Sequence, residues 1–273
     1  MKMSALFLSC FLLPVIVSAQ FTDTIKVTVH GHEVMLFSSG SGKATIILEA
    51  GGSSNHMCWK NVESGIAKFA KVISYDRPGY LLSEPCSTPG DAIKVATELK
   101  ESLTRANIPP PYILAGWSLG GAFVRVFAGL YPKDVSGLLL VDPTPEDFYA
   151  RADKEYPELM KEDSAYMHEI LNSNRIGERE EMKVFDTSMN QARLSDKLHA
   201  TPTILLIADR MKSDTLNGQP QNPIDRIWIE ELKKWGAKRQ NLKYEIVSKS
   251  NHYIARDRPD AVLKALKKLI VQH

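Results

Sequence analysis

Short apolar runs and amphipathic segments alternate along this chain, and the alternation predicts its architecture. Apolar runs of strand length occur at Thr45–Glu49, Val72–Tyr75, Tyr112–Ala115, Val135–Val141, Thr203–Ala208 and Leu242–Val247. Helical spacing of apolar residues occurs at Asp91–Ala106, with Ile93, Ala96, Leu99 and Leu103 on one face, and at Ile224–Trp235 and Pro259–Val271. Strands that alternate with helices predict an α/β fold, in which a mostly parallel central sheet carries helices on both faces.

A histidine-containing turn separates two alternating segments near the start, Thr24–His30 and Val34–Phe37. The alternation predicts an antiparallel hairpin at an edge of the sheet, with His30-Gly31-His32 as its turn. Two histidines at this spacing also look like a pair of metal ligands. Because no further ligand lies near them in the sequence, we expect surface residues of the hairpin and no metal site.

The first nineteen residues have the pattern of a secretory signal peptide. A short basic start precedes an apolar run, Ala5–Val17, and small residues then favour cleavage before Gln20. The run is shorter than an ordinary membrane span, and the alternatives are an uncleaved anchor or a lipoprotein at Cys10. We expect residues 1–19 to be removed, residues 20–273 to form one domain, and the mature protein to be periplasmic or secreted, without a membrane attachment.

Charge and cysteine content add little to this picture. The formal net charge is +2, which gives no reason to expect nucleic acid or an acidic partner. Cys58 and Cys86 remain once the signal peptide is removed. In an exported protein they could form a disulfide, and the alternative is two separate buried thiols.

One segment interrupts the alternation of strands and helices. From Pro145 to about residue 200, charged residues dominate, acidic ones are in excess, and Tyr, Met and Phe recur at helical spacing. A disordered acidic linker would lack such aromatic residues. The pattern therefore predicts a helical cap, or lid, inserted at about residues 145–200 over the carboxyl edge of the sheet.

The segment Gly116-Trp117-Ser118-Leu119-Gly120 directly follows an apolar strand and directly precedes a helical pattern. Gly-x-Ser-x-Gly is common by chance, and a glycine turn with a capping serine is the alternative interpretation. Between a strand and a helix, however, it predicts a nucleophile elbow that exposes the Ser118 hydroxyl. The backbone N–H of Leu119 would then point toward a developing oxyanion.

Other candidate residues follow strands that would end at the same edge of the sheet. The small-residue loop Ala50-Gly51-Gly52 follows one strand, and Gly52 is our candidate for the second oxyanion N–H. Asp142, Asp209 and His252 each follow another predicted strand. Because ligands bind beyond the carboxyl ends of the strands in such sheets, we expect these residues and Ser118 to form one site.

Together these motifs resemble the α/β-hydrolase fold family over nearly all of residues 20–273. The resemblance rests on Ala50-Gly51-Gly52, Tyr75-Asp76-Arg77-Pro78-Gly79, Gly116–Gly121 and Asn251-His252-Tyr253. The order serine, acid, histidine is also that of the family. Asp76 and Arg77 are expected to make a structural ion pair and turn rather than to take part in catalysis.

The resemblance implies a role for each candidate. Ser118 would be the nucleophile, His252 its base, and the backbone N–H groups of Leu119 and Gly52 the oxyanion hole. Many members carry the acid near the position of Met211, which cannot serve. Others carry it after the preceding strand, where Asp142 lies, so Asp142 is preferred and Asp209 is the alternative.

The resemblance further implies a serine hydrolase that cleaves a small ester or related acyl substrate through an acyl-enzyme, without metal or organic cofactor. A proline-type aminopeptidase and a non-catalytic binding protein of the same fold are the alternatives. The former would need an acidic pocket for a free amine. The expected partner is the small acyl substrate, and the sequence does not determine the oligomeric state.

Overall fold

The computed structural model describes residues 23–86, 88, 90–196, 200–210, 215–216, 219–220 and 222–271. The signal peptide expected at residues 1–19 lies outside the described residues. Within the described part of the chain, no helix has the length and apolar character needed to cross a bilayer.

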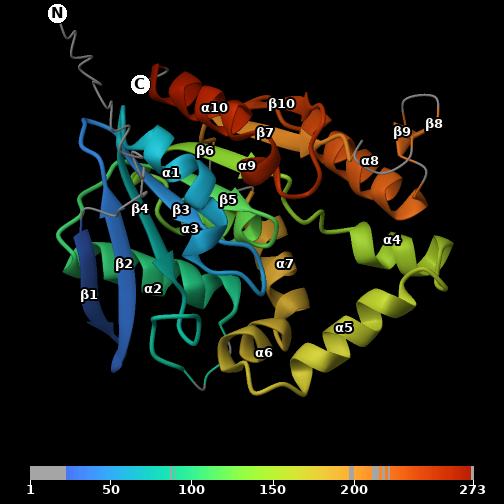
Figure 1. The fold of residues 1–273 in the computed structure, drawn as a ribbon, viewed down its shortest axis with the longest axis horizontal. Helices are drawn as coiled ribbons and strands as arrows, with labels where there is room; N and C mark the ends of the chain where they lie inside the picture. The colour runs from blue at the N-terminus through green and yellow to red at the C-terminus, as the bar shows by residue number, and fades with distance from the viewer. Residues whose placement is uncertain are drawn as a thin grey trace, which may run out of the picture.

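An eight-stranded sheet forms the centre of the molecule, in the order β1-β2-β4-β3-β5-β6-β7-β10 (Figure 1). Its strands are β1 (Asp23–Val29), β2 (His32–Ser39), β3 (Thr45–Glu49), β4 (Lys71–Asp76), β5 (Tyr112–Trp117), β6 (Val135–Val141), β7 (Thr203–Ala208) and β10 (Leu242–Val247). The six strands β4, β3, β5, β6, β7 and β10 pair in parallel. At one edge of the sheet, β1 pairs antiparallel with β2, and β2 pairs antiparallel with β4. The mostly parallel sheet and its antiparallel edge hairpin are thus confirmed. A separate two-stranded hairpin joins β8 (Thr215–Leu216) to β9 (Gln219–Pro220).

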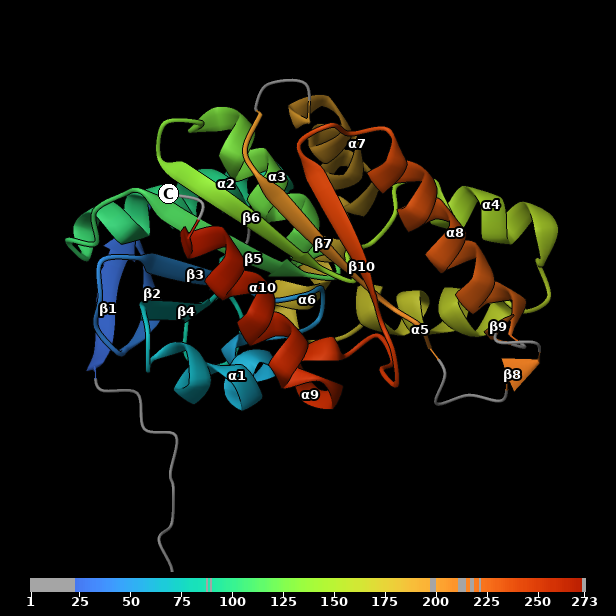
Figure 2. The same ribbon diagram turned by 90° about the horizontal axis from the view of Figure 1, so that it is seen from above.

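Helices cover both faces of this sheet, as Figure 2 shows. On one face lie α1 (Lys60–Ile66), α9 (Ile254–Asp257) and α10 (Pro259–Val271), after the short 3-10 helix η1 (His56–Trp59). On the other lie α2 (Ala92–Arg105), α3 (Gly120–Leu130) and α8 (Pro223–Ala237). Each set buries its own apolar cluster against the sheet, which explains why the parallel strands read as continuous apolar runs.

The buried face of α2 differs from the expectation in one position. Ala96, Leu99 and Leu103 are buried, but Ile93 is 43% exposed. Val95 takes the place expected for Ile93, because Asp91 caps the helix and turns Ala92 and Val95 toward the sheet. Both thiols within the described residues are free: Cys58 is buried and Cys86 is partly exposed, so they do not form a disulfide.

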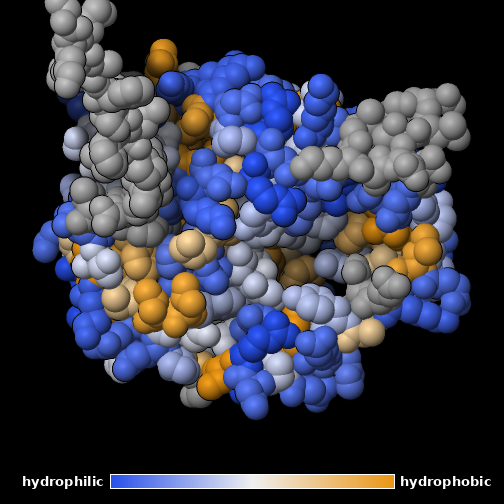
Figure 3. Space-filling view, viewed as in Figure 1, coloured by the Kyte–Doolittle hydropathy of each residue, from blue (hydrophilic) through white to orange (hydrophobic). Residues whose placement is uncertain are grey.

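Four helices lie between β6 and β7, in the segment where an insertion was expected. They are α4 (Phe148–Glu155), α5 (Lys161–Leu171), α6 (Ile176–Met182) and α7 (Phe185–Ser195). Helix α7 packs on α3 and α2, whereas α4 to α6 extend away from the sheet (Figure 1). The face in Figure 3 is largely hydrophilic, with apolar residues inside a hollow beside these helices.

Candidate active site

Ser118 stands on the sharp turn between β5 and α3. Its φ of +53° lies in the left-handed region, which is strained for a serine and puts its side chain at the head of the helix. Glycines on both sides permit the turn. A Cβ on Gly116 would lie 2.4 Å from the carbonyl oxygen of Gly120, and one on Gly120 would lie 2.4 Å from that of Ala50.

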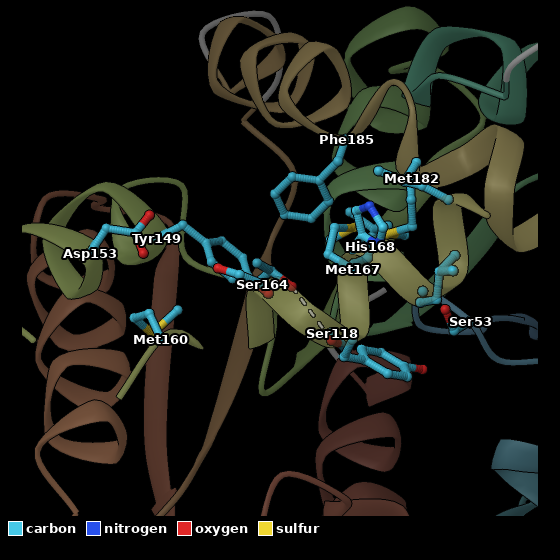
Figure 4. Close-up of a pocket in the computed structure, with 16 residues that line it drawn as sticks. Ser53, Ser118, Tyr149, Asp153, Met160, Ser164, Met167, His168, Met182 and Phe185 are labelled. Carbon is cyan, nitrogen blue, oxygen red and sulfur yellow. Dashed lines mark hydrogen bonds between the residues drawn. The ribbon is translucent and has the colours of Figure 1, made fainter. Parts of the chain in front are cut away.

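Three of the predicted site residues come together in a hydrogen-bonded chain. His252 Nε2 lies 3.0 Å from Ser118 Oγ, and His252 Nδ1 lies 2.7 Å from Asp142 Oδ2. These residues come from the loops after β5, β6 and β10, which end at one edge of the sheet. The Thr144 hydroxyl, which sequence reasoning did not single out, lies 3.4 Å from Ser118 Oγ (Figure 4).

Asp142 is fully buried and also has a positive φ, +44°. Its Oδ1 accepts a hydrogen bond of 3.0 Å from the backbone N–H of Ala208, and its Oδ2 accepts one of 2.8 Å from Arg210. The carboxylate is therefore held from three directions. The sequence alone did not point to Arg210, because nothing in a single sequence indicates that it reaches the residue after β6.

Two tryptophans and an aspartate position the loop of His252. The Trp117 indole N–H donates a 2.8 Å hydrogen bond to the backbone carbonyl of His252, and the Trp228 ring lies edge-on to the imidazole. Asp209 contacts the backbone of the same loop. It accepts backbone N–H groups from Lys249 at 2.8 Å and Ser250 at 3.2 Å, which orders the residues just before the histidine.

The Ala50-Gly51-Gly52 loop lies directly against the turn of Ser118. A Cβ on Gly51 would lie 3.1 Å from Ser118 Cβ, and one on Gly52 would lie 3.2 Å from Leu119 Cδ2. The predicted oxyanion residues Gly52 and Leu119 are therefore neighbours in space. Both line the same pocket as Ser118.

Buried Arg77 holds this loop from behind. Its guanidinium donates to the carbonyl oxygens of Ala50 at 2.9 Å and Gly51 at 2.8 Å, and it pairs with Glu49 and Glu181 at 2.7 Å each. Burial raises the pKa of Glu49 to about 7, an effect that the positive charge of Arg77 opposes. Arg77 thus makes structural ion pairs, but with Glu49 on β3 and Glu181 on α6 and not with Asp76, so the expected partner was wrong.

Asp76, the other charged residue of that motif, has a different partner. Its Oδ1 accepts hydrogen bonds from the ring Nδ1 of His56 at 2.8 Å and from the backbone N–H of His56 at 3.1 Å. His56 and Asp76 are both buried. This pair joins the start of η1 to the end of β4, and neither residue lines the pocket of Ser118.

Two glycines let α6 approach the loop after β4 closely. A Cβ on Gly79 would lie 2.6 Å from the backbone nitrogen of Gly177, and one on Gly177 would lie 2.8 Å from the Gly79 carbonyl oxygen. The Arg77–Glu181 ion pair lies in the same contact. Helix α6 therefore packs against the loop after β4 and is linked, through Arg77, to the Ala50-Gly51-Gly52 loop.

The Ser118 hydroxyl opens into a pocket of about 550 Å³ between the sheet and α4 to α7. Its apolar lining includes Leu119, Tyr149, Met160, Met167, Met182 and Phe185. The polar side chains of Asp153, Ser164 and His168 belong to exposed residues. Figure 4 shows Met160 and Asp153 far from Ser118, and Ser53 on the opposite side.

A family model described as alpha/beta hydrolase fold matches residues 44–203, which is more than half of the chain. The chain belongs to the alpha/beta hydrolase fold family. The matched range includes Gly52, Ser118 and Asp142 and stops before His252.

Curated relatives are similar to this family member over part of their length. YbdG of Bacillus subtilis (strain 168) is 29% identical over 118 residues, which are 42% of this chain and 36% of that protein. A pimeloyl-[acyl-carrier protein] methyl ester esterase of Hamiltonella defensa is 27% identical over 109 residues, 40% of each chain. The chain thus spans about two fifths of the length of the curated relatives it matches.

Solved structures are similar over most of the chain. A thermophilic esterase from Thermogutta terrifontis has a TM-score of 0.63 and 18% identity, over 92% of this chain and 98% of that one. At this identity the similarity shows the alpha/beta hydrolase fold, and the chemistry has to be argued from the residues of the site.

Proposed function

We propose that the protein is a serine hydrolase that cleaves small esters or related acyl compounds through an acyl-enzyme. The observation that carries the proposal is the unbroken chain from Ser118 Oγ through His252, at 3.0 Å, to Asp142, at 2.7 Å. A hydroxyl is a weak nucleophile until a neighbouring base accepts its proton, and this geometry supplies the base.

In the proposed first step, Ser118 Oγ forms a bond to the substrate carbonyl carbon while its proton passes to His252 Nε2. The tetrahedral intermediate collapses, the bond to the leaving alcohol breaks, and that oxygen takes the proton from His252. Water then attacks the acyl-enzyme with His252 again as base, which releases the acid and restores Ser118. Asp142 keeps the proton of His252 on Nδ1 and stabilises the imidazolium.

The backbone N–H groups of Leu119 and Gly52 are the proposed oxyanion hole. Leu119 is the N-cap residue of α3, so the positive end of the helix dipole favours negative charge at this point. Gly52 belongs to a loop that buried Arg77 holds by its carbonyl oxygens. Donors held rigidly in advance need no reorganisation during the reaction, and one such donor typically contributes about 10²–10³ in rate.

The pocket favours an apolar acyl or alcohol group. Methionine, aromatic and branched aliphatic side chains together form most of its wall, and three methionines can adapt their shape to different substrates. The similarity to a pimeloyl-[acyl-carrier protein] methyl ester esterase supports ester chemistry. An aminopeptidase would need carboxylates near Ser118 to bind the substrate amine. Among the side chains that the structure describes, Asp153 is the one acidic residue of the lining, and it is exposed and distant from Ser118 (Figure 4).

A fluorophosphonate probe followed by mass mapping tests the proposal, since such probes label activated serines. We expect labelling at Ser118, its loss in Ser118→Ala and a large reduction in His252→Gln. Hydrolysis of p-nitrophenyl acetate and prolyl-naphthylamide then separates the classes, and we expect turnover of the ester alone. Labelling at another serine, or a folded protein that neither reacts nor turns over, would overturn the proposal in favour of a binding protein.

A further inference from the structure

A second group of chemically reactive side chains lies outside the Ser118 pocket, between β2, α2 and the loop after β4. His32 begins β2, Glu98 lies in α2, and Cys86 follows β4. One ligand atom from each lies within 4.8 Å of the other two, and His32 Nε2 is 3.6 Å from Glu98 Oε1. None of these residues lines the pocket of Ser118.

Two of these ligand atoms are buried and have no hydrogen-bond partner. His32 is 7% exposed and Glu98 is 4% exposed, yet His32 Nε2 and Glu98 Oε1 each lack a partner within the described residues. Leaving a buried donor or acceptor unpaired costs about 1–3 kcal/mol, and more for a charged group. His30 and Lys94 approach Glu98 Oε1 only to ion-pair distances of 3.6 and 3.8 Å, so the described side chains leave both facing atoms without a hydrogen bond.

The site has room for one small ion. A cavity of about 20 Å³, enough for a single water molecule or metal ion, is lined by Cys86, Glu98 and Lys94 among others. His32, whose Nε2 lies 3.6 Å from Glu98 Oε1, is outside this lining. The Lys94 ammonium lies 3.3 Å from Cys86 Sγ and 3.8 Å from Glu98 Oε1. The group therefore already attracts a positive charge, and the partly exposed lysine can move away when a stronger cation binds.

The parts that carry the ligands are fixed to one another. The loop before Cys86 is hydrogen-bonded to β2, through Glu84 N to the Glu33 carbonyl at 2.9 Å and Met35 N to Ser83 Oγ at 2.9 Å. Helix α2 packs against β1, the strand paired with β2. Ligand atoms that lie about 2.0–2.3 Å from one tetrahedral Zn²⁺ are about 3.3–3.8 Å from one another. The three ligand atoms here lie within 4.8 Å of one another, so side-chain adjustments alone can bring them onto one ion.

We propose that His32 Nε2, Cys86 Sγ and Glu98 Oε1 bind one divalent cation of the zinc class. Imidazole, thiolate and carboxylate are the ligands that Zn²⁺ takes in proteins, and the thiolate disfavours Mg²⁺ and Ca²⁺. A water molecule or His30, whose Nδ1 lies 3.6 Å from Glu98 Oε1, completes the tetrahedron. Sequence reasoning discounted the two histidines because Cys86 and Glu98 are distant in the chain, and the fold brings them together.

Cobalt(II) substitution tests the site, because a cobalt–thiolate bond gives a strong near-ultraviolet charge-transfer band. The full chain, without a histidine tag and stripped of metal by a chelator, is titrated with Co²⁺ and then with Zn²⁺ under a phosphine reductant. We expect one equivalent of Co²⁺ with that band, and its displacement by one equivalent of Zn²⁺.

Variants assign the ligands. Cys86→Ser should abolish the charge-transfer band, and Glu98→Gln and His32→Gln should each weaken Zn²⁺ binding about tenfold or more. Cys58→Ser, the matched control at the other free thiol, should leave the band unchanged. Should His32→Gln fail to fold, Cys86→Ser still decides, because Cys86 is partly exposed.

A second readout is the melting temperature, since Zn²⁺ that binds the folded state should raise it in the wild type and not in Cys86→Ser. Fluorophosphonate labelling of Ser118 should be the same in both proteins, so the metal site and the proposed hydrolase are tested separately. The proposal is overturned by a wild type that binds no Co²⁺ or Zn²⁺, or by a charge-transfer band that survives in Cys86→Ser.

Discussion

Arg210 donates a hydrogen bond of 2.8 Å to Asp142 Oδ2, the same oxygen that lies 2.7 Å from His252 Nδ1. A guanidinium and an imidazole thus share one carboxylate oxygen. Arg210 is held in turn by Asp225 at 2.9 Å and by the ring of Trp228, which also contacts the imidazole. The orientation of the proposed acid therefore depends on a cation outside the proposed triad.

Arg210→Met should lower kcat for p-nitrophenyl acetate by about ten- to a hundredfold, because Asp142 loses one of the contacts that fix its plane and misplaced catalytic groups are costly. Arg210→Lys keeps the positive charge but not the planar guanidinium, whose two terminal nitrogens donate to Asp142 and Asp225, so it should recover part of the rate. Labelling of Ser118 by the fluorophosphonate probe should slow in parallel. A folded Arg210→Met protein with the wild-type kcat would contradict this positioning role.

The two candidate acids can be separated by isosteric substitution. Asp142→Asn should reduce kcat by about 10⁴-fold, since the amide favours the wrong histidine tautomer. Asp209→Asn should cost about tenfold or less, because Asp209 orders the backbone of Lys249 and Ser250 and not the imidazole. Both rates are measured with p-nitrophenyl acetate on proteins of matched circular dichroism. The reverse ranking would make Asp209 the acid.

Arg77→Met should destabilise the protein and impair the oxyanion loop together. Removing one partner of a buried ion pair typically costs about 3–5 kcal/mol, and here Glu49 and Glu181 are both left without their cation. Urea unfolding monitored by tryptophan fluorescence gives the loss. The exposed pair Arg105–Glu101 supplies a control, where Arg105→Ala should cost about 0.5 kcal/mol or less. Equal losses in the two variants would refute the bridging role.

Stability should fall as the pH rises through the range in which Glu63 ionises. Burial in α1 raises the pKa of Glu63 to about 7, whereas the unfolded chain releases this proton near its ordinary value of 4.5. The folded state therefore holds the extra proton between these values. Its free energy of unfolding should decrease by up to about 3 kcal/mol from pH 4.5 to above 7.

Glu63→Gln should remove the part of that dependence that comes from Glu63, whereas Glu49, whose pKa burial also raises to about 7, should keep its own part. The variant and the wild type should be similarly stable near pH 4.5, and the variant should be the more stable one at pH 8. Urea titrations across this range measure the difference. Glu158→Gln, at an exposed position of the chain, should reproduce the wild-type curve. A wild-type curve that rises across this interval would show that Glu63 is charged at low pH.

The local pattern was enough to predict most of the sheet. Buried parallel strands have apolar side chains on both faces, so β3, β6 and β7 begin and end where their apolar runs do. Helix α1 was not predicted, because it contains Gly65 and a charged residue, Glu63, that is buried. Ile93 was assigned to the wrong face, since its spacing fits the buried stripe as well as that of Val95 does.

The candidate site was predictable where a motif fixes its own surroundings. The elbow of Ser118 and the late His252 carry that information, and the structure brings them within 3.0 Å. Contacts between residues far apart in the chain carry no local signal. Arg210 at Asp142, Arg77 at Glu181, and Cys86 and Glu98 beside His32 could be found only once the fold was known.

The glycine contact between Gly79 and Gly177 divides the four helices after β6 into parts with different freedom. Helix α6 is packed backbone to backbone against the loop that Arg77 starts, so insertions or bulky replacements there would disturb the chemistry itself. Within the described residues, α5 makes no comparable backbone contact with the loop after β4. Its residues Met167 and His168 nevertheless line the pocket. Substitutions in α5 should therefore change the substrate preference of the proposed hydrolase without moving Ser118, His252 or Asp142. This makes α5 the natural segment to randomise when a new selectivity is sought.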